Sequence, residues 1–90
     1  MENCDMPNNY YFTFSASGNH AFVGGWVKVI AFGKADAIQT FLRHYPRKYG
    51  SALHCADLYT EEEFKKTGMM ERGNFGKFQQ GKTLFSLRLG

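Results

Sequence analysis

The chain has 90 residues, a length that fits one domain and leaves no room for two. Nine Phe, five Tyr and one Trp supply enough rings for a small core, and this composition argues against a disordered chain. The formal net charge of +3 permits an anionic partner but does not require one.

Residues 1–8 are polar, and we expect them to form a flexible arm ahead of a single domain over residues 9–90. The arm has neither the basic region nor the apolar region of a signal peptide. No apolar run in the chain approaches the ~20 residues that a membrane span needs. We therefore expect a cytoplasmic protein that has no contact with membranes.

Two strands are predicted in the first third of the chain, over residues 10–15 and 26–32. Residues 16–25 contain several glycines and are expected to form the hairpin loop between them, with Phe22 near its tip. Lys28 marks one face of the second strand as nearer to water. In the first strand, one face consists of Tyr10, Phe12 and Phe14, and the other of Tyr11, Thr13 and Ser15. In the second strand, one face consists of Val27, Val29 and Ala31, and the other of Trp26, Lys28 and Ile30.

Residues 35–45 are predicted to form an amphipathic helix, because apolar residues recur at the spacing of one helical face. Pro46 ends this helix. Residues 53–59 form a third predicted strand, which we expect beside the first strand, so that the helix covers the apolar face of the sheet. The apolar stripe of the helix consists of Ile38, Phe41, Leu42 and Tyr45.

A second helix is predicted to begin after Thr60, because Glu63 lies at the spacing of a capping box. Gly68 is expected to end it. Residues 69–81 are rich in glycine and ambiguous, and residues 83–89 are a candidate for the last strand. In that strand the apolar face consists of Thr83, Phe85, Leu87 and Leu89, and the other face of Leu84, Ser86 and Arg88.

The order of these elements, β-β-α-β-α-β, predicts an α+β fold. We expect a small, mainly antiparallel sheet of three to four strands with one or two helices on one face. If the second and third strands are parallel, the connection through helix 35–45 should be right-handed.

The sequence contains no catalytic or phosphate-binding signature, and we expect no enzyme activity and no cofactor. Two cysteines are too few for a disulfide scaffold, although one bridge between them is an alternative to two reduced thiols. No two candidate ligands have the spacing typical of zinc sites, so we expect no metal unless distant segments assemble a site. The candidate ligands are Cys4, His20, His44, His54 and Cys55.

The main basic and aromatic cluster spans residues 43–49, at the end of helix 35–45 and in the loop beyond it. Loops run over protein surfaces, and Arg and Tyr are enriched at binding hot spots, so we expect a partner to bind here. A second basic set follows Gly68, with two phenylalanines among its residues. The expected partner-binding residues are Arg43, Arg47, Lys48, Tyr49 and Phe22, and the second set is Arg72, Lys77, Lys82 and Arg88 with Phe75 and Phe78.

Four features between residues 9 and 68 give the chain a family resemblance: the aromatic strand 10–14, the opening Gly25-Trp26-Val27, the helix 35–45 and the run LYTEEEF at 58–64. With these features it resembles small accessory proteins of phages and mobile elements in Gram-positive bacteria. Some members of that class block bacterial defence, anti-CRISPR proteins among them. The resemblance implies a small inhibitor that occludes a surface of a host or defence protein, a CRISPR effector being one candidate. The alternative is a nucleic-acid-binding module that uses basic and aromatic residues.

Overall fold

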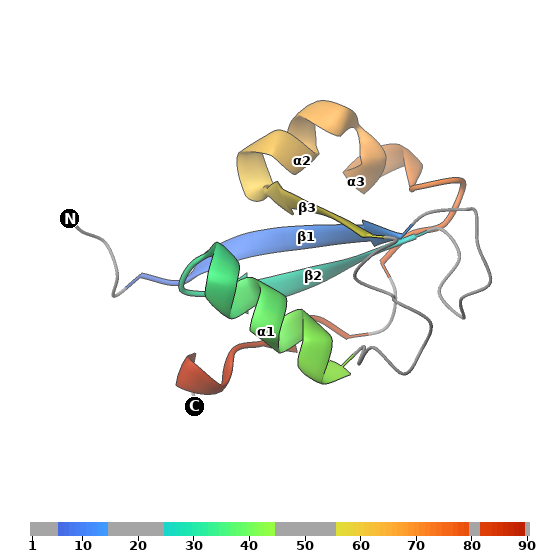
Figure 1. Ribbon diagram of the computed structural model, residues 1–90. Helices are drawn as coiled ribbons and strands as arrows, with labels where there is room; N and C mark the ends of the chain where they lie inside the picture. Colours follow the sequence, from blue (N-terminus) through green and yellow to red (C-terminus); the bar gives the residue numbers. More distant parts are fainter. Residues whose placement is uncertain (1–5, 15–24, 45–55, 80–81, 90) are drawn as a thin grey trace.

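The protein forms a four-stranded mixed sheet with helices packed against it (Figure 1). The computed structural model describes residues 6–14, 25–44, 56–79 and 82–89. In chain order the elements are β1 (Asn8–Phe14), β2 (Trp26–Ala31), α1 (Lys34–His44), β3 (Ala56–Thr60), α2 (Glu61–Thr67), α3 (Met69–Arg72), β4 (Leu84–Phe85) and a short 3-10 helix (Leu87–Leu89). The expected α+β class is confirmed.

The strands lie in the order β3-β1-β2-β4. β1 pairs antiparallel with both β2 and β3, so β2 and β3 run in the same direction with β1 between them. β4 pairs parallel with β2 at Val29 and Ile30. The sheet is therefore mainly antiparallel, and the third strand lies beside the first as expected.

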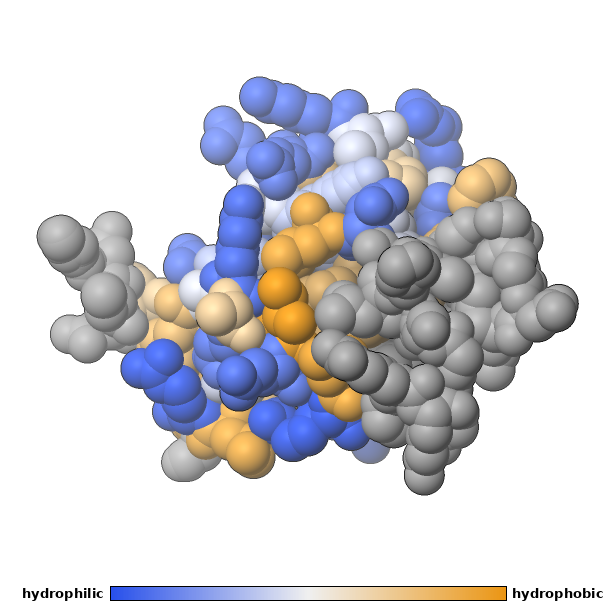
Figure 2. All heavy atoms as spheres, in the orientation of Figure 1, coloured by the Kyte–Doolittle hydropathy of each residue, from blue (hydrophilic) through white to orange (hydrophobic). Residues whose placement is uncertain are grey.

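α1 covers one face of the sheet. Its residues Ala37 and Phe41 are fully buried against the face of β1 that carries Phe12 and Phe14. The Phe41 ring lies 4.3 Å from that of Phe12 and 5.8 Å from that of Phe14, measured between centroids. Half-buried side chains of α1 and β3 complete this core, and Figure 2 shows a band of hydrophobic surface beside α1. The predicted helix is confirmed as far as His44, and Tyr45 lies outside the described residues.

The opposite face of the sheet carries a second core, which differs from the expectation of helices on one face only. α2 places Phe64 on the rings of Tyr11 and Trp26, with centroid distances of 4.4 and 5.0 Å. The physical reason is that the face assigned to water because of Lys28 also presents these two large rings. A second helix is needed to bury them, and α2 and α3 lie on the side of the sheet opposite α1 (Figure 1).

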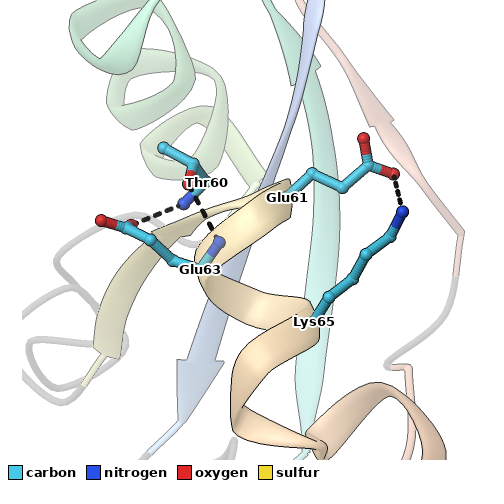
Figure 3. Close-up of polar contacts among 4 residues, drawn as sticks. All are labelled: Thr60, Glu61, Glu63 and Lys65. Atoms are coloured by element: carbon cyan, nitrogen blue, oxygen red, sulfur yellow. Dashed lines mark hydrogen bonds and ion pairs between the residues drawn. The ribbon is translucent and has the colours of Figure 1, made fainter.

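The N-terminus of α2 has the predicted capping box (Figure 3). The Thr60 hydroxyl accepts a hydrogen bond from the Glu63 N–H at 3.2 Å, and the Glu63 carboxylate accepts one from the Thr60 N–H at 3.0 Å. The bond from the Thr60 N–H is the largest cause that holds the pKa of Glu63 below its ordinary value. Gly68, at φ 79°, ends α2 in the left-handed conformation expected of a C-terminal glycine.

Candidate interaction surface

Arg43 is the only predicted binding residue within the described ranges, and it lies exposed in the last turn of α1. Its guanidinium donates a hydrogen bond of 3.3 Å to the backbone carbonyl of Phe85 on β4. Arg43 therefore lies beside Phe85, which was not predicted to bind a partner. The other four predicted binding residues lie outside the described residues: Phe22, Arg47, Lys48 and Tyr49.

Residues 84–89 expose the face that alternation marked as apolar. Phe85 and Leu87 are 57% and 73% exposed, whereas Leu84 and Ser86 are 8% and 3% exposed. β4 ends at Phe85, and a 3-10 helix replaces the rest of the predicted strand. The chain thus buries a serine and leaves a phenylalanine and a leucine in water.

Hydrogen bonds explain why Ser86 is buried. Its hydroxyl donates a hydrogen bond to the carboxylate of Asp36, which also accepts one from the backbone N–H of Phe32 at 3.0 Å. The Ser86 hydroxyl accepts the N–H of Arg88 at 3.1 Å, and its own N–H donates to the carbonyl of Ile30 at 2.9 Å. Buried polar groups require such partners, and here they attach the end of the sheet to the start of α1.

Two arginines flank this network. The Arg88 guanidinium lies 4.9 Å from the centre of the Phe32 ring, and Arg43 reaches Phe85 from α1. Desolvation raises the pKa of Asp36, but its hydrogen bonds and the positive charges of Arg88 and Arg43 outweigh that effect. The pKa of Asp36 therefore lies below its ordinary value, and the carboxylate is charged at neutral pH.

Phe85, Leu87 and Leu89 form an exposed apolar surface, which we call the Phe85 patch. Together with Ser86 they line a shallow hollow of about 440 Å³. Figure 2 shows hydrophobic side chains at the lower edge of the molecule, where the last turn of the chain lies in Figure 1, bordered by hydrophilic ones. Apolar side chains beside arginines are typical of protein-binding surfaces.

A second exposed aromatic lies at the other end of β2, in the segment that was ambiguous in sequence. Asn74 and Lys77 pair backbone to backbone, at 2.7 and 3.0 Å, around a turn with φ 53° at Phe75 and 77° at Gly76. Positive φ at both central positions is the pattern of a type I′ turn, which favours Asn or Gly. A phenylalanine held there costs about 1–3 kcal/mol, and its side chain is 68% exposed. Asn74 and Gly76 are turn-forming residues from which this turn was predictable.

No cluster of three metal-ligating side chains occurs among residues 6–14, 25–44, 56–79 and 82–89. Of the five candidate ligands only His44 is described, and a ring nitrogen of it lies 3.1 Å from the Thr40 carbonyl on the same helix. Cys4, His20, His54 and Cys55 lie outside the described residues, so the prediction of no metal stays a prediction.

None of the helices in the described ranges has both the length and the apolar character needed to cross a membrane. Comparisons with protein-family models, with curated proteins and with solved structures found no match for the chain.

Proposed function

We propose that this protein is a small interaction protein that binds a host or defence protein in the bacterial cytoplasm and inhibits it by covering one of its surfaces. The supporting observation is the exposure of Phe85 and Leu87 beside the buried Ser86. Full burial of one such apolar side chain contributes roughly 1.5–3 kcal/mol. The isolated domain forgoes that stabilisation at two neighbouring positions, and a partner that covers the Phe85 patch recovers it.

The charges beside the patch indicate which partner surface would fit. Arg43 and Arg88 lie next to Phe85 and Leu87, and the chain as a whole is basic. An apolar partner surface with an acidic rim would complement this arrangement and speed association. A CRISPR effector is one candidate, in keeping with the resemblance to phage accessory proteins.

Inhibition of a nuclease tests the proposal directly. The purified protein is titrated into a panel of CRISPR effectors, and cleavage of target DNA is measured. We expect near-stoichiometric inhibition of one effector. The double variant Phe85→Ser, Leu87→Ser should need about ten times more protein for the same inhibition, because truncated hot spots commonly cost more than 1 kcal/mol. Phe78→Ser, which alters an exposed aromatic outside the patch, is the matched control.

Two outcomes would contradict the proposal. Equal inhibition by the wild type and the double variant would remove the Phe85 patch from the binding site. If no effector is inhibited and no host protein copurifies from cells, the protein is not an inhibitor of this kind. Direct binding to single-stranded DNA that weakens steeply with added salt would support the nucleic-acid alternative instead.

A further inference from the structure

A hollow of about 250 Å³ lies beside the Phe75 turn, on the side of the sheet that carries α3. Asp57 and Tyr59 of β3 form one part of its wall, and Met69 of α3 and Phe75 form another. Asp57 is the only charged side chain among the described lining residues, and it forms no salt bridge with a described residue. The hollow therefore combines one carboxylate with aromatic and thioether surface. The remaining described lining residues are Thr13, Phe14 and Asn74.

Phe75 is held in place by its neighbour Asn74, which is 9% exposed. The Asn74 side-chain amide donates to the carbonyls of Phe14 at 2.9 Å and of Gly25 at 2.8 Å. Its own carbonyl accepts the N–H groups of Gly25 and Lys77, each at 3.0 Å. The three bonds to Phe14 and Gly25 attach the turn to the end of β1 and to the residue before β2, and the bond from Lys77 closes the turn itself. An unfavourable backbone conformation that the surroundings maintain is a common feature of binding sites.

We propose that this hollow is a binding site for an arginine side chain of a partner protein. A guanidinium is planar, so it can stack on the exposed Phe75 ring while it donates hydrogen bonds to the Asp57 carboxylate. Met69 and the Tyr59 ring accommodate the aliphatic part of the arginine side chain. This site lies at the opposite end of β2 from the Phe85 patch, because Gly25 contacts Asn74 while Ile30 pairs with Phe85. It is therefore independent of the proposed function.

The probe for the test is N-acetyl-arginine amide, titrated into the ¹⁵N-labelled protein and followed by NMR. We expect saturable shifts of the Asp57, Tyr59 and Phe75 amides, with a dissociation constant in the millimolar range. The neutral isostere N-acetyl-citrulline amide should bind about tenfold more weakly, since it has no charge to pair with Asp57. Asp57→Asn should lower the affinity for the arginine probe to a similar extent, whereas Glu62→Gln, an exposed carboxylate on α2, should not change it.

Phe75→Asn separates binding from folding. It creates an Asn-Gly pair, which is favoured in this turn type, so the thermal midpoint should rise by several degrees. Binding of the probe should fall about tenfold in the same variant, because the stacking surface is lost. Equal binding of the arginine and citrulline probes, or full binding by Asp57→Asn or Phe75→Asn, would overturn the proposal.

Discussion

The ring of Phe41 on α1 lies nearly parallel to that of Phe12 on β1, with centroids 4.3 Å apart and an angle of 10° between the planes. Both side chains are fully buried. Phe41→Ala should lower the free energy of unfolding by about 3–5 kcal/mol, because it removes this contact and leaves a cavity between helix and sheet. Urea denaturation measures the change. Gln39→Ala, at an exposed position of the same helix, should stay within about 0.5 kcal/mol of the wild type.

Thr60→Ala should destabilise the protein by roughly 0.5–2 kcal/mol, because the Glu63 N–H loses its acceptor at the start of α2. Thr60→Ser keeps the hydroxyl and should retain most of the stability. Thermal denaturation of both variants tests the cap. If Thr60→Ser is as unstable as Thr60→Ala, the hydroxyl does not contribute the stability.

Asn74→Ala should lower the free energy of unfolding by about 1–3 kcal/mol, because it removes the two hydrogen bonds that the buried Asn74 amide donates. These bonds reach the carbonyls of Phe14 and Gly25, and the Gly25 carbonyl still accepts the Phe14 N–H at 3.1 Å in the variant. Asn74→Asp should be at least as unstable at neutral pH, since it turns a carboxylate oxygen toward both carbonyl oxygens. Hydrogen exchange at the ends of β1 and β2 would locate the effect, and unchanged protection there would contradict it.

Asp36 should make stability depend on pH. Its pKa is lower in the folded protein than in the unfolded chain, so the unfolded chain binds more protons in acid. The contribution of Asp36 is complete above the ordinary carboxyl pKa of 3.8 and is lost as the pH falls through the lower folded value. Asp36→Asn should therefore be less stable than the wild type at neutral pH, and the difference should shrink in acid. A constant difference across a pH series of urea midpoints would contradict this assignment.

Charge reversal tests the predicted loop that follows α1. The double variant Arg47→Glu, Lys48→Glu should bind an acidic partner surface more slowly and with less dependence on salt. Its stability should stay within about 0.5 kcal/mol of the wild type, as is usual for surface substitutions. Surface plasmon resonance at several salt concentrations measures the association rate. Full retention of that rate would exclude both residues from the binding surface.

The sequence predicted the elements whose signals are local. Helix 35–45 agrees with α1 to within one residue at its start, because apolar periodicity and Pro46 both act within that segment. The capping box at Thr60 was predictable for the same reason. The strands that became β1 and β2 were recognisable from their β-branched and aromatic residues.

The Phe85 patch was not predictable from the same signals. Alternation assigns the more apolar face of a strand to the core. Here Ser86 takes the buried position because Asp36, on a helix far away in the sequence, provides its hydrogen-bond partner. Only the tertiary structure brings these two residues together. Of the predicted binding residues, Arg43 alone can be compared with this patch, and it lies in contact with it.

The burial of β1 on both faces has a consequence for strand pairing. In a strand with one wet face, a slip of one residue would expose the apolar set to water. In β1 a slip of one residue turns the Phe12 face to the side of the sheet where the Tyr11 face was, and both faces carry large buried rings. Hydrophobicity therefore discriminates weakly between neighbouring registers. Asn74 provides this discrimination between registers. Its amide bridges the carbonyls of Phe14 and Gly25 only when these two residues are opposite each other, and so it fixes the register of β1 and β2.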